Sequence, residues 1–196
     1  MRWVAPAALL LLIGACATLQ QIAALSRVAF ALGSVGNGKL AGVSLSRIAS
    51  YRDLGITDVG RIAVAVARND LPLEFTLDLQ ASNPPENRTT ATMVGLAWTL
   101  LLDGRETISG NLDSSYTLPA GQMVRIPLVM RLNLKQFFSG SAESLIDLAA
   151  GLAGVRADPT RVTLRATPTI NTPIGAISYP APITIVSTSV GAARAP

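Results

Sequence analysis

Few side chains in this chain of 196 residues have the chemistry for catalysis or metal binding. Histidine is absent and Cys16 is the single cysteine. The commonest zinc and copper ligands are therefore missing, as are the Ser-His-Asp and Cys-His catalytic pairs. Paired carboxylates could still act as acid and base. The best pair, Glu74 and Asp78, would lie roughly 13 Å apart along one face of a strand, too far to share a proton. We predict no catalytic residue, no metal site and no cofactor.

The remaining acidic pairs have simpler structural explanations. Asp53 and Asp58 lie near the start of a predicted short helix, and Asp58 is its expected N-cap. Glu143 and Asp147 are one helical turn apart on a second predicted helix, where they would form the solvent-exposed side. The chain has 16 basic and 12 acidic residues and no basic run, so we predict no nucleic-acid partner.

Cys16 lies at the end of an N-terminal apolar segment. Arg2 precedes an apolar run over residues 7–13, and small residues occupy positions 14 and 15. This order of charged, apolar and small residues is typical of a secretory signal. The run is too short to cross a bilayer as a helix, which takes about 20 residues. An exported chain with no other cysteine also needs no disulfide pairing.

The residues Ile13-Gly14-Ala15-Cys16 resemble the lipobox of bacterial lipoproteins, in which a signal peptidase cuts before the cysteine and its thiol receives a diacylglycerol. We predict cleavage between Ala15 and Cys16 and acylation of Cys16; an ordinary signal peptide with a chance cysteine is the alternative. Acyl chains would hold the protein on a membrane, because each buried methylene contributes roughly 0.8 kcal/mol. By resemblance to the lipoprotein sorting rule, Ala17 favours the outer membrane, with the protein facing the periplasm.

The chain is predicted to have four segments. Residues 1–15 are the lipoprotein signal peptide, 16–26 the acylated cysteine and tether, 27–188 one folded domain, and 189–196 a disordered tail.

Most of the domain is predicted to be β-strand. Alternation of apolar and polar residues is strict over 73–82, 94–102 and 124–132, which indicates half-buried strands. Further strands are expected over 27–32, 40–48, 105–111, 162–166 and 183–186. Short helices are expected over 58–68, with Ile62 and Val66 on one face, and over 141–152, with a leucine face.

Turn signals separate these strands. They are the glycine-rich region 33–42, Asn83-Pro84-Pro85, Asp103-Gly104, and Leu118-Pro119-Ala120-Gly121, the last as a type I turn. Trp98 lies in the apolar register of its strand and is expected in the core. Asn87-Arg88-Thr89 matches a glycosylation acceptor, which we discount as a chance triplet. Together, the predicted strands and turn signals indicate an all-β fold, an antiparallel β-sandwich with one or two short added helices.

Three stretches, "FTLDLQASNP", "LAWTLLLDGRETISG" and "LPAGQMVRIPLVMRLNL", follow one another between Phe75 and Leu134. In this order they resemble the group 2 late-embryogenesis-abundant proteins, also called the WHy (water stress and hypersensitive response) domain family. The resemblance implies an immunoglobulin-like or fibronectin-like sandwich, a link to desiccation and other stress, and no catalytic residues. The residues that match the family pattern are Asn83, Pro84, Asp103, Gly104, Gly110, Ile126 and Pro127.

Three functions remain open at this stage. The first is a non-enzymatic, lipid-anchored envelope protein of the water-stress type, which protects or contacts other envelope components, either proteins or lipids. The second is a periplasmic lipoprotein that holds a lipid or another apolar ligand between its sheets, with the 141–152 helix as a lid. The third is a structural subunit of an envelope complex.

Overall fold

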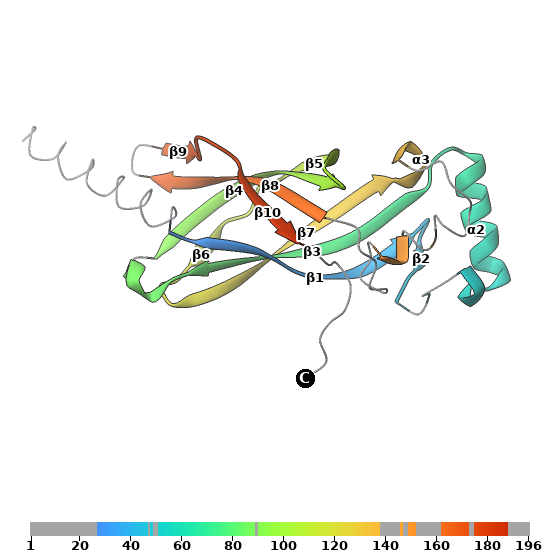
Figure 1. Ribbon diagram of the computed structural model, residues 1–196, viewed down its shortest axis with the longest axis horizontal. Helices are drawn as coiled ribbons and strands as arrows, with labels where there is room; N and C mark the ends of the chain where they lie inside the picture. The colour runs from blue at the N-terminus through green and yellow to red at the C-terminus, as the bar shows by residue number, and fades with distance from the viewer. Residues whose placement is uncertain are drawn as a thin grey trace, which may run out of the picture.

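The computed structural model describes residues 27–46, 48, 51–88, 90–137, 146, 149–151, 162–172 and 175–187. Over these residues the chain forms two antiparallel sheets that pack face to face (Figure 1). The antiparallel β-sandwich, predicted with one or two short added helices, is therefore confirmed.

The first sheet has four strands in the order β2-β1-β3-β7. The second has the order β10-β8-β4-β5, with β6 paired to β4 and β9 paired to β8. The strands are β1 (Ala29–Leu40), β2 (Val43–Ser44), β3 (Pro72–Asn83), β4 (Ala91–Leu102), β5 (Arg105–Leu112), β6 (Tyr116–Leu118), β7 (Gln122–Asn133), β8 (Val162–Thr172), β9 (Gly175–Ser178) and β10 (Ile183–Ser187). The helical segments are η1 (Tyr51–Asp53), α2 (Ile56–Ala67), η2 (Pro85–Asn87) and α3 (Leu134–Phe137).

The strongest sequence pattern produces the most regular pairing. β3 pairs with β7 without interruption from Pro72↔Asn133 to Asn83↔Gln122. Side chains alternate between the two faces of a strand, so the residues at every second position of both strands point to the other sheet. Those of β3 are buried as predicted: Leu73, Phe75, Leu77, Leu79 and Ala81.

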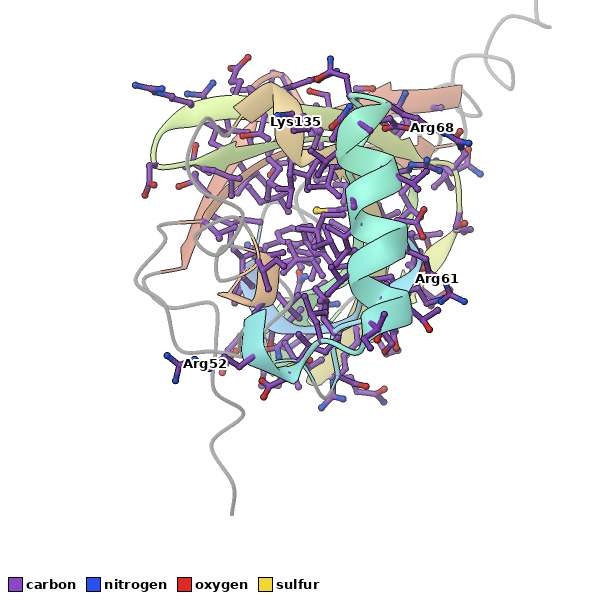
Figure 2. All side chains as sticks on the ribbon, turned by 90° about the vertical axis from the view of Figure 1, so that its right-hand side faces the viewer. Arg52, Arg61, Arg68 and Lys135 are labelled. Carbon is purple, nitrogen blue, oxygen red and sulfur yellow. The ribbon has the colours of Figure 1, made fainter. Side chains whose placement is uncertain are left out.

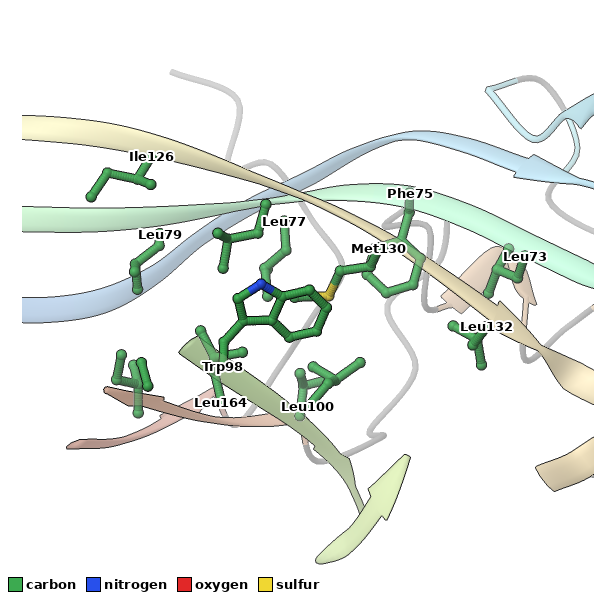
Figure 3. Packing of buried hydrophobic residues seen from close by; sticks show 14 of the residues in the cluster. Leu73, Phe75, Leu77, Leu79, Trp98, Leu100, Ile126, Met130, Leu132 and Leu164 are labelled. Carbon is green, nitrogen blue, oxygen red and sulfur yellow. The ribbon is translucent and has the colours of Figure 1, made fainter. Parts of the chain in front are cut away.

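The core lies between the sheets, and leucine is the commonest of its described residues. Trp98 is 8% exposed and points into this space near Leu77 and Met130, as predicted for a core residue (Figure 3). Ile126 and Leu128 enter from β7, completing the layer against β4 and β8.

The glycine-rich region 33–42 is not the predicted turn. β1 continues through it to Leu40 and stays paired with β3, with register shifts between Leu32 and Val35 and between Gly36 and Lys39. Glycine is common at such bulges, and Asn37 has the positive φ of 56°. The chain reverses only at Ala41–Gly42, so the second predicted strand is reduced to the two residues of β2.

The predicted helix over 58–68 is present, but Asp58 is not its N-cap. α2 begins at Ile56, Gly55 occupies the cap position without a side-chain hydrogen bond, and Asp58 lies in the first turn. Asp58 still benefits from the helix dipole there. Ile62 is buried as predicted, whereas Val66 is 38% exposed. The helix crosses one end of the sandwich, so only a narrow strip of it can be buried (Figure 1).

The predicted inward register of β4 is correct in its middle and wrong at its start. A register shift between Met93 and Gly95 in the pairing with β8 turns Met93 into the core and leaves Val94 half-buried. A second shift between Leu100 and Leu101, in the pairing with β5, accompanies the burial of both leucines. Bulges of this kind depend on the partner strand, which alternation in one strand does not reveal.

The two predicted tight turns have different outcomes. Asp103 and Gly104 both have positive φ, 49° and 80°, as a type I′ hairpin turn requires. The second turn lies one residue later than predicted, because the Gln122 N–H bonds to the Pro119 carbonyl at 3.2 Å. Gly121 is then the third residue, and its φ of 75° is the conformation that position takes in a type II turn rather than a type I turn.

Most of the predicted helix over 141–152 lies outside the described residues, including its leucine face, Glu143 and Asp147. The four residues of it that are described, 146 and 149–151, are helical, and Ile146, Ala149 and Ala150 are buried. The predicted tail over 189–196 also lies outside the described part.

The register of β7 against β3 can be tested at two neighbouring residues of β7. Leu128 is 1% exposed and Val129 is 76% exposed. We expect Leu128→Ala to lower the free energy of unfolding by about 3 kcal/mol through lost burial and a cavity. The matched control Val129→Ala should change it by less than about 0.5 kcal/mol. Urea denaturation followed by tryptophan fluorescence measures both, and equal effects would contradict the assigned register.

Candidate functional site

The seven residues of the family pattern do not form one site. Asn83 and Pro84 lie where β3 leaves the first sheet, and Asp103-Gly104 form the β4–β5 turn at the far end of the twelve-residue strand β4. Gly110 lies within β5, and Ile126 and Pro127 lie within β7. Each has a separate structural role, and no cleft brings them together.

Asn83 is the most constrained of these residues. It is fully buried, and its side-chain amide donates a hydrogen bond to the Leu118 carbonyl at 2.7 Å. Its side-chain oxygen accepts one from the Asn87 amide at 2.6 Å. Its backbone carbonyl accepts one from the Gly121 N–H at 2.8 Å. Asn83 therefore joins the end of β3 to η2 and to the β6–β7 turn, which is more than the strand-ending role that its Asn-Pro step suggests.

Asn87 is buried with it, at 7% exposure. An amide that is buried and bonded to Asn83 is a poor target for a glycosyltransferase, which agrees with discounting the triplet at 87–89.

Gly110 has a packing role that depends on Trp98. The two residues are directly paired between β4 and β5, so side chains at both positions would point to the same face. A Cβ atom at position 110 would lie 2.5 Å from Cζ2 of the Trp98 indole. Only glycine leaves room for the ring in its present place, which explains why a glycine closes this strand pattern.

Ile126 and Pro127 illustrate the two faces of an edge strand. Ile126 is fully buried, and Pro127 is exposed opposite Asp78 of β3. Proline cannot donate a ladder hydrogen bond, and β7 is the last strand of its sheet, where that loss is tolerated.

The carboxylates of the described residues are spread over the surface. Glu74 lies 3.4 Å from Arg131, and Asp78 accepts a hydrogen bond from the Ser34 hydroxyl at 2.9 Å. They share the outer face of β3, as predicted, but each has its own partner. Within the described ranges, no three acidic or cysteine side chains gather closely enough to hold a metal ion.

One hollow lies over the outer face of β4, β5 and β8. It has a volume of about 440 Å³, and Arg165 and Glu106 form an ion pair of 2.7 Å among its lining residues. The hydroxyls of Thr99 and Ser109 bond to each other at 2.9 Å nearby. These polar groups are already satisfied by one another, so the hollow offers few unpaired groups to a ligand.

A second hollow of about 480 Å³ lies beside α2, where the helix meets the ends of β1 and β3. Apolar residues from both sides line it, among them Ala41, Val64 and Pro72. The guanidinium-bearing residues Arg61 and Arg68 and the carboxylate residue Asp70 also contribute. No pattern in the sequence marked this groove, because its two sides come together only when the helix crosses the end of the sandwich.

Cys16, Ala15 and the rest of the predicted lipid-attachment segment lie outside the described residues, so the predictions of cleavage and acylation stay predictions. Among the residues that are described, no helix is long and apolar enough to span a bilayer.

Comparisons with known proteins reveal structural similarity only. No family model and no curated protein matches the sequence. The chain is structurally similar to a late embryogenesis abundant (LEA) protein, with 11% identity, a TM-score of 0.41, and coverage of 95% of this chain and 86% of that one. It is also similar to a protein from Archaeoglobus fulgidus, with 14% identity, a TM-score of 0.36, and coverage of 80% and 94% respectively. A protein from Arabidopsis thaliana matches with 19% identity and a TM-score of 0.39, over 61% of this chain and 70% of that one. Similarity at this level transfers no function.

Asn83→Ala removes both side-chain hydrogen bonds and leaves the Leu118 carbonyl and the Asn87 amide without this partner in the interior. Buried groups that lose a partner destabilise by about 1–3 kcal/mol each, so we expect a loss of at least about 2 kcal/mol in unfolding free energy. Asn171→Ala, at an exposed position of β8, is the control and should change stability little. Thermal and urea denaturation measure both variants, and equal stability would show that the Asn83 hydrogen bonds contribute nothing.

Gly110→Ala places a methyl group against the Trp98 ring, and overpacking of this kind destabilises by about 1–3 kcal/mol. Gly36→Ala is the control, because a Cβ there meets nothing within 4 Å. In a Trp98→Phe background the effect of Gly110→Ala should shrink, since a smaller ring leaves space. Additive effects of the two substitutions in urea denaturation would contradict a direct contact.

Proposed function

We propose that the protein is a non-enzymatic, lipid-anchored envelope protein of the water-stress type. The observation that carries this proposal is the ordered set of family-pattern residues between Asn83 and Pro127. Within the described structure these residues act at strand ends, at a tight turn and at a glycine–tryptophan contact. They maintain a rigid sandwich and supply no reacting groups, which suits a protein that works by contact.

The anchor is the acylated Cys16. The apolar run and the Ile13-Gly14-Ala15-Cys16 sequence support its placement, and Ala17 supports the outer membrane with the domain on the periplasmic side. Two or more acyl chains give stable attachment, whereas one chain binds only marginally. The anchored sandwich would then meet the envelope proteins and lipids that drying or osmotic shock brings close.

Carriage of an apolar ligand between the sheets is less well supported. In the described part of the domain, the space between the sheets is occupied by packed side chains (Figure 3). Both hollows described above lie on the outer surface. A carrier would need the core residues to separate, which the dense packing of buried leucines opposes.

A deletion strain of the parent bacterium tests the proposal when it carries the wild-type gene, Cys16→Ser or Ala17→Asp. We expect deletion to lower survival after drying and osmotic shock, and the wild-type gene to restore it. Cys16→Ser should abolish incorporation of labelled palmitate, move the protein out of the membrane fraction and fail to restore survival. Ala17→Asp is the matched control, which should keep the label and shift the protein to the inner membrane.

Two results would contradict the proposal separately. Unchanged survival of the deletion strain, with no second gene of this type present, would remove the stress function. Palmitate label on the Cys16→Ser protein would remove the anchoring site.

A further inference from the structure

The helix α2 has an unusual outer side for a surface helix. Ile62 faces the sandwich and is buried, whereas Ile56 is 95% exposed and Val64 is 50% exposed. Helices on the surface of a globular domain normally have polar residues on the solvent side. Here Gly60, Ala63, Val64 and Ala67 are all exposed, so the outer side is largely apolar.

Unpaired positive charge flanks this apolar side. Arg61 and Arg68 are seven residues apart and therefore project from the same side, about 10 Å apart along the helix axis. In the described part of the chain neither has a carboxylate within the 4.0 Å that defines an ion pair, unlike Arg131 and Arg165. Figure 2 shows both arginines at this end of the molecule, together with Arg52 and Lys135.

Three acidic residues lie at the same end and do not cancel this charge. Asp58 is half-buried in the first turn of α2, on the side toward the sandwich. Asp53 already has an interaction partner. Asp70 lines the same groove as Arg68, and because of its carboxylate the groove is not uniformly basic. On the outward side of the helix itself the only charged group is cationic, Arg61.

We propose that the α2 end is a docking surface for an anionic phospholipid bilayer. Ile56 and Val64 would enter the headgroup boundary, while Arg61 and Arg68, which both lie on the α2 side of the adjoining groove, bind lipid phosphates. An exposed apolar stripe flanked by unpaired arginines fits a surface that offers both phosphate charge and an apolar interior. This inference goes beyond the proposed function, because the folded domain makes the contact and the acyl group does not.

A second copy of the chain fits this surface less well. Two such faces brought together by two-fold symmetry would place the unpaired arginines of both copies against one another. A stable dimer also buries roughly 800 Å² on each partner, more than the outer side of a twelve-residue helix of small residues provides.

The experiment is a vesicle co-sedimentation assay. The protein is the chain from residue 16 with Cys16→Ser, which keeps every described residue and cannot be acylated. The vesicles are phosphatidylcholine alone, or phosphatidylcholine with about one third phosphatidylglycerol. We expect binding to the anionic vesicles only, weakened by salt because exposed charges are screened.

The variants locate the contact. Arg61→Glu with Arg68→Glu should lower the partition coefficient at least tenfold, and Ile56→Ser should lower it by a smaller factor. The matched controls are Arg125→Glu and Val129→Ser, which alter one exposed cation and one exposed aliphatic residue on β7. Both controls should bind as the parent protein does. Circular dichroism checks that each variant is folded.

Several outcomes would overturn the proposal. They are equal binding to neutral vesicles, no binding to either vesicle, loss of binding in the β7 controls, or no effect of the α2 variants. A dimer in light scattering that Ile56→Ser abolishes, without vesicle binding, would assign the face to a second copy. The assay uses protein without an acyl group, so its failure leaves the anchoring and drying tests intact, and their failure leaves this result intact.

Discussion

The pairing of β3 with β7 is the constraint on which the rest of the sandwich depends. Twelve consecutive residues of each strand are in register. Every second residue is buried from Leu73 to Asn83 of β3 and from Ile126 to Leu132 of β7. A slip of β7 by one residue against β3 would turn Leu128 to solvent and bring Pro127 inside. The free-energy cost of that exchange fixes the register of the two strands. The register in turn places β1 along the other side of β3 and the groove beside α2 at the end of β3.

Because the register of the first sheet is fixed, it also determines which side chains the second sheet must contribute to the core. Met130 and Leu77 leave a space that a large flat side chain fills, and Trp98 fills it from β4 (Figure 3). The indole in turn requires that its neighbour on β5 have no side chain, which Gly110 satisfies. Gly110 of the family pattern is thus explained by packing against Trp98 rather than by a ligand.

The same physics explains which features the sequence could predict. Strands β3 and β7 and the Asp103-Gly104 hairpin turn depend on local alternation and local backbone preference, and all three were predicted. The continuation of β1 through its glycines was not, because glycine favours turns and bulges alike and only the partner strand decides. The buried hydrogen bond from Asn83 to the Leu118 carbonyl was also missed, since it joins residues 35 positions apart in the chain.

The docking surface proposed at α2 could not be predicted from the sequence either, for a related reason. Helical periodicity predicted that Ile62 and Val66 would share the buried side, but the helix lies across the narrow end of a sandwich and contacts little of it. Burial is then confined to Ile62 and its nearest neighbours, and the remaining apolar residues stay outside. The exposure of Ile56 and Val64 is therefore set by where the helix lies.

The position of α2 has a consequence for an anchored molecule. β1 begins at the opposite end of the sandwich and runs its twelve residues toward α2, a distance of about 40 Å (Figure 1). From Cys16, the proposed acylation site, to residue 28 there are thirteen residues, which reach about 45 Å when fully extended. On the proposed anchoring, the α2 end could turn back to its own bilayer only with the tether stretched along the whole domain. A stretched tether loses conformational entropy, which opposes that arrangement. The docking surface at α2 would therefore more readily face a surface other than the bilayer that holds the acyl chains.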